Sequence, residues 1–277
     1  MRRFGRRTNG LARRLPAPKP GEEVIRLEGV TKSFGDQTVL RDIDLSFRHG
    51  QTTVVLGRSG CGKSVLLKTI IGILKPDSGR VIVFGRDLAT LPFEELEAMR
   101  LNFGMLFQGS ALFDSLDVDN NVGFLLYEHT SMPRREVQEI VRKKLAQVGL
   151  TGEITRMPDE LSGGMKKRVA LARAIAMDPH VILYDEPTTG LDPVTADTIN
   201  DLVLKIQKRF QATSIVVTHD MASANKVADR IVMLHEGRII IDDTPEAVRK
   251  SGDPRVQSFI RGDASIEAAA GRSGGPS

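Results

Sequence analysis

The fold is decided by Gly57-Arg58-Ser59-Gly60-Cys61-Gly62-Lys63-Ser64, a stretch that fits the pattern G-x-x-x-x-G-K-[ST]. It follows a short β-branched run, Thr52–Leu56, and it opens a helical pattern that extends from Lys63 to about Leu74. Glycines let backbone N–H groups turn inward around phosphates, and the N-terminus of the following helix adds partial positive charge. An ordinary glycine-rich turn is the alternative, but the flanking strand and helix favour a phosphate-binding loop.

This loop predicts a nucleotide and a metal ion as ligands. We expect Lys63 to reach the β- and γ-phosphates of ATP and the Ser64 hydroxyl to hold Mg²⁺. Cys61 is interpreted as a tolerated filler in the loop. The residues predicted to cradle the nucleotide here are Gly57, Arg58, Ser59, Gly60, Cys61, Gly62, Lys63, Ser64 and Val65.

A second carboxylate-bearing segment lies far along the chain. Residues 181–184 are an apolar strand that ends in Asp185 and Glu186. Asp185 is placed to join the Mg²⁺ shell, and Glu186 is placed to polarise an attacking water. Alone, such a pair is usually turn chemistry, but the phosphate-binding loop favours the catalytic interpretation.

Strand and helix patterns alternate on both sides of a helical middle. Such alternation predicts an α/β fold with a mostly parallel sheet and helices on both faces. Residues 93–176 are predicted to be a helical subdomain inserted into this core. Strands are expected at 24–30, 42–47, 52–56, 81–84, 181–184, 214–218, 231–234 and 239–241, and helices at 63–74, 93–100, 134–148, 165–176 and 194–210.

The formal net charge of +4 is unevenly placed. Residues 1–20 hold seven basic residues and no acidic one, so the rest of the chain has more acidic than basic residues. A nucleic-acid-binding body shows the reverse, so we predict no nucleic-acid partner. We predict a disordered basic leader over residues 1–21, with attraction to anionic lipid headgroups as the alternative. An Ala/Gly/Ser-rich disordered tail is predicted over 263–277.

The sequence contains no apolar run of the 18 or more residues that a membrane span needs. The single cysteine excludes an internal disulfide and suits a reducing cytoplasm.

A further motif narrows the class of nucleotide-binding protein. Leu161-Ser162-Gly163-Gly164-Met165 resembles the LSGGQ signature of the ABC ATPases. It precedes a predicted helix, whose N-terminus and glycine backbone suit an anion. It also lies before Asp185 at the interval expected in that family.

Other family markers follow in family order. Phe34 matches the aromatic residue that stacks on adenine, and Gln108 matches the glutamine that joins the Mg²⁺ site to the transmembrane partner. Thr189-Gly190-Leu191-Asp192 resembles the loop at the dimer interface, and His219 matches the histidine that contacts the γ-phosphate. The resemblance implies catalytic roles for Glu186, His219, Lys63 and Gln108, nucleotide contacts from Phe34, Ser162, Gly163, Gly164 and Asp192, and Mg²⁺ contacts from Ser64, Gln108 and Asp185.

The resemblance covers about residues 22–262. It implies a P-loop NTPase of ABC type, with a RecA-like core, an antiparallel β edge and an inserted helical subdomain. It also implies that each ATP lies between the phosphate-binding loop of one copy and the signature of a second copy. Met165 replaces the usual glutamine and Thr189-Gly190 replaces the common Ser-Ala, but neither change removes a phosphate ligand, so we expect activity to survive.

One nucleotide-binding unit without a membrane span resembles the separate ATPase subunit of a bacterial multi-subunit transporter. Residues 104–116, 127–130 and 253–256, together with Met165, resemble the Mla/MCE-associated ATPases, which move phospholipid between membranes. That family implies an integral-membrane permease and an MCE-domain lipid-binding protein as partners, and a peripheral position on the cytoplasmic face of the inner membrane. A small-solute or solvent-resistance transporter, and a non-transport scaffold in cell division or cofactor assembly, are the alternatives.

Overall fold

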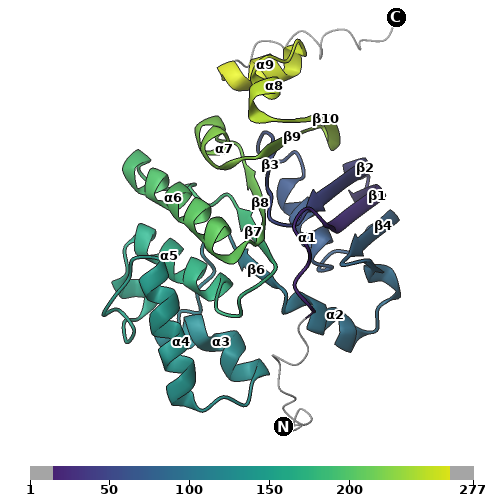
Figure 1. Cartoon of the computed structure of the whole chain (residues 1–277). Helices are drawn as coiled ribbons and strands as arrows, with labels where there is room; N and C mark the ends of the chain where they lie inside the picture. The colour runs from purple at the N-terminus through teal and green to yellow at the C-terminus, as the bar shows by residue number, and fades with distance from the viewer. Residues whose placement is uncertain (1–14, 263–277) are drawn as a thin grey trace, which may run out of the picture.

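A computed structural model describes residues 15–262 of the chain (Figure 1). Its strands are β1 (Glu23–Phe34), β2 (Gln37–Arg48), β3 (Thr52–Leu56), β4 (Ser78–Val83), β5 (Arg86–Asp87), β6 (Phe103–Leu106), β7 (Val181–Asp185), β8 (Thr213–Thr218), β9 (Arg230–His235) and β10 (Arg238–Asp243). They form a four-stranded sheet in the order β2-β1-β4-β5 and a six-stranded sheet in the order β10-β9-β3-β8-β7-β6.

The helices are distributed around these sheets. They are α1 (Lys63–Ile70), α2 (Phe93–Arg100), α3 (Val118–His129), α4 (Arg134–Gln147), α5 (Gly163–Ala174), α6 (Pro193–Phe210), α7 (Met221–Val227), α8 (Pro245–Arg249) and α9 (Pro254–Arg261), with 3₁₀ turns η2 (Leu88–Thr90) and η3 (Pro158–Glu160). None of the helices within residues 15–262 is both long and apolar enough to cross a membrane.

The six-stranded sheet is the centre of the molecule. Its strands pair in parallel, except for β10, which runs antiparallel to β9. Every residue of β3, β7 and β8 is buried, and alternate residues enter two different hydrophobic clusters: Val54 lies in one and Val55 in the other. This is why β3 and β7 appear in the sequence as continuous apolar runs, since both faces of a parallel sheet are covered. The predicted α/β fold with a mostly parallel sheet is confirmed.

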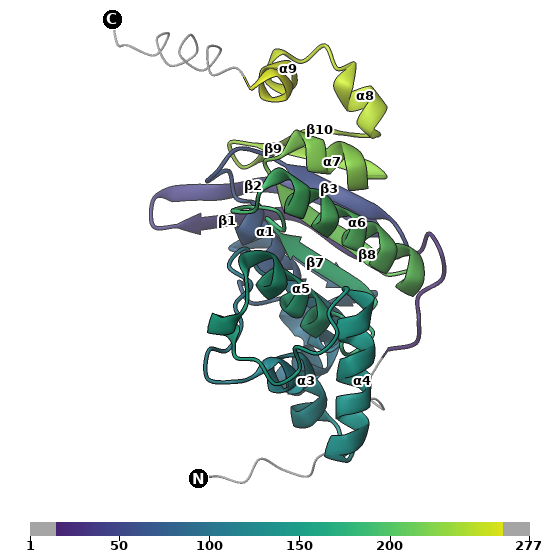
Figure 2. The ribbon, with the colours of Figure 1, turned by 90° about the vertical axis from the view of Figure 1, so that its left-hand side faces the viewer.

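The two hydrophobic clusters lie on opposite sides of this sheet. Helices α5, α6 and α7 lie along one side, and α1 with the four-stranded sheet lies along the other (Figures 1 and 2). In the smaller sheet β1 pairs antiparallel with both β2 and β4. The smaller sheet is the antiparallel β edge that the resemblance implied, and it carries Phe34 at the end of β1.

The boundaries of two helices differ from the prediction. Helix α1 ends at Ile70, four residues before the predicted limit, because Gly72 adopts a φ of +69° that a right-handed helix does not contain. Helix α5 begins at Gly163, two residues earlier than predicted, because Ser162 caps it: the Met165 amide donates to the Ser162 hydroxyl at 3.3 Å.

Strand β6 lies in the segment where only helix was predicted. It pairs in parallel with β7 and completes the edge of the large sheet, so the segment 93–176 is not helical throughout. Four residues give too short a run for a periodic signal, and Gly104 lacks a side chain. A Cβ there would lie 2.2 Å from the Ala174 carbonyl oxygen, so the glycine permits the close packing of α5 on β6. Beyond β6, helices α3, α4 and α5 pack on one another (Figures 1 and 2).

The described chain begins in contact with the body. The Leu15 amide donates to Asn102 Oδ1 at 3.2 Å, and its carbonyl lies 3.0 Å from His180 Nε2. The predicted disorder over residues 1–21 therefore does not extend to residues 15–21. The rest of the predicted leader, residues 1–14, and the predicted tail, residues 263–277, lie outside the described residues.

Candidate nucleotide-binding site

A cavity of about 730 Å³ lies at the carboxyl ends of the parallel strands β3, β7 and β8. This edge of an α/β sheet is where loops that follow the strands gather to bind ligands. The loop after β3 and the start of α1 provide seven of the sixteen lining residues, and the residues that follow β6, β7 and β8 provide three. The others come from β1, β2 and the region of α9. The lining residues are Phe34, Gln37, Val39, Arg58, Ser59, Gly60, Gly62, Lys63, Ser64, Val65, Gln108, Glu186, His219, Ser258, Phe259 and Gly262.

We call residues 57–64 the phosphate loop, and two of its glycines are needed for its shape. A Cβ on Gly57 would lie 2.5 Å from the Leu234 carbonyl oxygen, so the loop can approach β9 only without a side chain. Gly62 has a φ of +108°, and a Cβ there would lie 2.9 Å from the Val39 carbonyl oxygen. Backbone of this shape is accessible to glycine alone.

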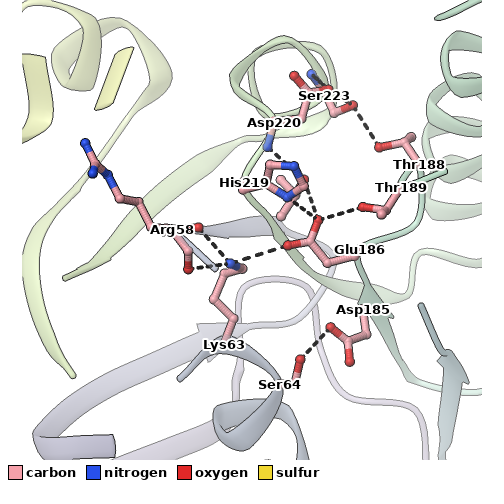
Figure 3. Close-up of polar contacts among 12 residues, drawn as sticks. Arg58, Lys63, Ser64, Asp185, Glu186, Thr188, Thr189, His219, Asp220 and Ser223 are labelled. Carbon is pink, nitrogen blue, oxygen red and sulfur yellow. Dashed lines mark hydrogen bonds and ion pairs between the residues drawn. The ribbon is translucent and has the colours of Figure 1, made fainter. Parts of the chain in front are cut away.

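The Lys63 side chain is almost fully buried inside the phosphate loop (Figure 3). Its Nζ donates to the carbonyl oxygens of Gly57 at 2.7 Å and Arg58 at 3.0 Å. It also lies 3.4 Å from Glu186 Oε1. A buried ammonium needs such partners, and here the charged partner Glu186 directly follows β7, 123 positions further along the sequence. The site thus holds a cation that faces the cavity and is ready to bind an anion.

Ser64 and Asp185 form the second polar pair (Figure 3). The Ser64 hydroxyl donates to Asp185 Oδ1 at 2.9 Å. Burial raises the pKa of the Asp185 carboxyl above its usual range, although the Ser64 hydrogen bond opposes that shift. A hydroxyl beside a carboxylate is a donor set of hard oxygens, which fits Mg²⁺. Residues 15–262 contain no group of three or more His, Cys, Asp or Glu side chains able to hold a metal ion.

Glu186 is held in an unusual backbone conformation. Its φ is +47°, which costs roughly 1–3 kcal/mol for a residue with a side chain. Its amide donates to the Val217 carbonyl at 2.9 Å, and its Oε2 accepts from the Thr189 hydroxyl at 3.1 Å and lies 2.9 Å from His219 Nδ1. The strained turn therefore aims the carboxylate into the cavity, between Lys63 and His219 (Figure 3).

Gln108 and Phe34 complete the predicted wall of the cavity. Gln108 is exposed just after β6 and lines the cavity. Phe34 is 48% exposed at the end of β1, with the Lys32 ammonium 5.6 Å from its ring centroid. An exposed aromatic ring at a cavity wall has a free face for a flat ligand. The structure thus brings Phe34, the phosphate loop, Gln108, Asp185, Glu186 and His219 to one place, while their roles remain predictions.

The remaining predicted residues lie apart from the cavity. Ser162 and Gly163 are exposed at the start of α5, and they do not line the cavity of their own chain. Asp192 caps α6 by accepting from the amides of Val194 at 3.1 Å and Thr195 at 3.0 Å, and its hydrogen bonds with Thr195 and Val194 hold the pKa of its carboxyl below the usual range. Their predicted role toward a second copy stays a prediction.

The structure adds site residues that the sequence interpretation missed. Ser258 and Phe259 of α9, and Gly262 at the C-terminal cap of that helix, line the cavity. Lys167 of α5 is buried behind it and donates to the Gln108 carbonyl. A signal for Lys167 was present: it shares the buried face of α5 with Ala170, Leu171 and Ala174, where a lysine is out of place.

The chain is similar to known proteins in sequence and in structure. The family model described as ABC transporter matches residues 40–189. The "Probable ribonucleotide transport ATP-binding protein mkl" of Mycobacterium tuberculosis is 42% identical over 238 residues, which is 86% of this chain and 66% of that protein. The chain therefore spans just under two thirds of that relative's length.

Two further comparisons cover nearly the whole of the related protein. The "Intermembrane phospholipid transport system ATP-binding protein MlaF" of Haemophilus influenzae is 39% identical over 242 residues, 87% of this chain and 92% of that protein. A dimeric structure of the ATP-binding cassette MJ0796, in a post-hydrolysis state bound to ADP and Pi, matches with a TM-score of 0.74 and 31% identity. That match covers 80% of this chain and 98% of the other, and it confirms the predicted ABC-type fold.

Proposed function

The chain belongs to the ABC transporter family, and from that premise we propose that it is the ATP-hydrolysing subunit of a membrane transporter. The observation that carries the proposal is the paired arrangement at the cavity. Lys63 lies 3.4 Å from Glu186, and Ser64 donates to Asp185 at 2.9 Å. The cavity therefore has a cation for phosphate, hard oxygens for a metal ion and a carboxylate for water.

These residues divide the work of hydrolysis. The phosphate loop binds the phosphates, and Lys63 exchanges its contact with Glu186 for the stronger charge of the β- and γ-phosphates. Ser64, Asp185 and Gln108 are the residues that would hold Mg²⁺, and the ion would neutralise charge on the phosphates. Glu186 accepts a proton from the attacking water, and His219 holds the Glu186 carboxylate in place.

The unit that hydrolyses ATP is a dimer of this chain. Support comes from the loop that contains Ser162, which is exposed and lies away from its own cavity. Helix N-termini with glycine backbone bind anions, so this loop completes the site of a second copy. The matched cassette MJ0796 was captured as a dimer.

We propose phospholipid as the cargo. MlaF of Haemophilus influenzae, whose printed name gives intermembrane phospholipid transport, is matched over 92% of its length. The partners are then an integral-membrane permease and an MCE-domain lipid-binding protein, and the chain lies on the cytoplasmic face of the inner membrane. The mkl relatives, named for ribonucleotide transport, favour a second cargo, but the chain spans only 66% of their length.

The cargo test uses the native complex. We expect the complex, purified from membranes with its permease, to carry bound phospholipid detectable by mass spectrometry. In a two-membrane host, deletion of the gene should weaken the outer-membrane barrier and raise detergent sensitivity. Wild-type protein should restore the barrier and Lys63→Ala should not. An intact barrier together with a defect in ribonucleotide uptake would overturn the phospholipid proposal.

A further inference from the structure

Lys167 is a buried lysine that the proposed chemistry does not use. It lies on α5, four residues after the exposed Gly163, and it is only 5% exposed. Its Nζ donates to the Gln108 carbonyl and lies 3.5 Å from the Glu186 carbonyl. The Lys167 ammonium therefore links α5, the helix that Ser162 caps, to the backbone of two predicted site residues, Gln108 and Glu186.

A second cation of α5 contacts the same segment. The Arg173 guanidinium donates to the carbonyl oxygens of Ser110 at 2.8 Å and Ala111 at 2.7 Å. Ser110 and Ala111 have φ values of +63° and +48°, which residues with side chains adopt rarely and at a cost. The backbone after Gln108 is therefore held in a strained shape, and two cations from α5 supply its partners.

The charge of Lys167 is also explained by its surroundings. Burial lowers the pKa of its ammonium, while the negative charges of Asp185 and Glu186 oppose that shift. A buried lysine is tolerated only where carbonyls or anions compensate for the lost water. Methionine would fill similar space without that requirement, so a structural role in packing does not account for a lysine at this position.

We propose that Lys167 is a positioning residue for hydrolysis: it fixes Gln108 and Glu186 relative to the helix that presents Ser162 to a second copy. The assignment rests on the proposed ATPase function. It makes α5 a rigid connection between two nucleotide sites. Ser162, at the start of the helix, faces the site of a second copy, and Lys167, just over one turn later, contacts the site of its own chain. Since the ammonium contacts backbone oxygens, its loss should shift both residues without removing any group that touches ATP.

The test compares two buried lysines in the purified complex. Lys167→Met should lower kcat for ATP hydrolysis at least about tenfold, because small misplacements of catalytic groups are costly. The KM for ATP and the Kd for a fluorescent ATP analogue should change less than about threefold, because the phosphate loop is untouched. Lys144→Met is the matched control: Lys144 is equally buried, pairs with Asp178 and lies away from the cavity. It should leave kcat within about twofold while affecting thermal stability.

Rescue distinguishes positioning from packing. Lys167→Arg keeps the charge, so its kcat should exceed that of Lys167→Met by more than about threefold at similar Tm. If Lys167→Met does not fold, Lys167→Gln decides, since it keeps a donor but no charge and should still lose kcat. Wild-type kcat in a folded Lys167→Met or Lys167→Gln protein, or an equal loss in Lys144→Met, would overturn the assignment. If the wild-type complex itself hydrolyses no ATP, the proposed function is wrong. If the wild-type complex is active and only the expected effects of the Lys167 variants are missing, the assignment of Lys167 alone is wrong, so the two failures are distinguishable.

Discussion

The phosphate loop and the loop of residues 161–165, which we call the Ser-Gly-Gly loop, are both rich in glycine and both lead into a helix, but their surroundings differ. In the phosphate loop the lysine is buried, with contacts to Gly57, Arg58 and Glu186, and the loop lines a cavity. In the Ser-Gly-Gly loop the Ser162 side chain caps its own helix, and Ser162 and Gly163 are exposed. The first loop is complete within one chain, and the second presents its polar groups outward.

This difference is the basis of the proposed dimer, in which each nucleotide site takes residues from two copies of the chain. Glu186 and Lys63 compensate each other inside the phosphate loop, so the cavity can form before ATP arrives. The Ser-Gly-Gly loop has a backbone suited to an anion, and the cavity of its own chain lies elsewhere. The predictions below test this division between a half-site that binds and a half-site that completes hydrolysis.

The largest effect is expected from Lys63→Ala. The variant removes the buried cation of the phosphate loop and leaves Glu186 buried without its charged partner. We expect loss of ATPase activity by about a thousandfold or more, with weakened ATP binding, since this lysine neutralises the phosphates. Turnover and equilibrium binding of a fluorescent ATP analogue measure both. Near-normal turnover would mean that the cavity is not the hydrolytic site.

Glu186→Gln should separate binding from hydrolysis. The amide keeps the size and polarity of the side chain but cannot accept a proton, so kcat should fall by about a hundredfold to ten-thousandfold. ATP should still bind, and size-exclusion chromatography of the complex or subunit with ATP should show more dimer than for wild type. A variant that hydrolyses ATP normally would remove Glu186 from the proposed role.

Ser162→Arg tests the outward-facing half-site. The bulky cation should fill the place of the phosphates of the second copy, so hydrolysis should fall by about a hundredfold while the isolated subunit binds ATP normally. Ser162→Ala is the comparison variant: it adds no bulk and no charge, and it removes the hydroxyl with its helix cap, at a cost of about 1 kcal/mol, so it should reduce hydrolysis less than Ser162→Arg. Loss of ATP binding in the isolated Ser162→Arg subunit would show that the two half-sites are not separate.

His219→Ala should have a smaller effect. The histidine ring lies 2.9 Å from Glu186 Oε2, but the hydroxyls of Thr189 at 3.1 Å and Thr218 at 3.4 Å donate to the same oxygen. We expect kcat to fall by about tenfold to a hundredfold with ATP affinity unchanged, because positioning is lost and binding is not. Steady-state kinetics decide this, and an increase in KM at constant kcat would contradict it.

The same contrast shows what the sequence could and could not predict. The phosphate loop and the strand before Asp185 carry strong local signals, and the structure places these residues together at one cavity. Strand β6 was missed because its four residues are recognisable only through pairing with β7. Lys167 was missed because motif matching stops at Met165. The residues of α9 that line the cavity were not predicted either, because no local sequence pattern indicates that this helix lies beside the phosphate loop.

We expect the smallest effect from Met165→Gln, which restores the glutamine that is usual at this position in the family. Met165 contacts the loop through its backbone N–H, which donates to the Ser162 hydroxyl at 3.3 Å. A glutamine at this position has the same backbone N–H, so the contact is kept. Its side chain is half-buried and packs against the larger hydrophobic cluster, where an unbranched side chain of similar length fits.

We therefore expect kcat and KM to stay within about threefold of wild type in the isolated subunit, since the backbone contact is kept and a half-buried side chain leaves the glutamine amide access to water. The informative measurement compares the subunit with the full complex. If Met165→Gln is silent in the subunit but reduces ATPase activity in the complex, the side chain acts on a partner. A large loss in the subunit itself would instead show that this side chain belongs to the outward-facing half-site, and the division between backbone and side chain in the Ser-Gly-Gly loop would be wrong.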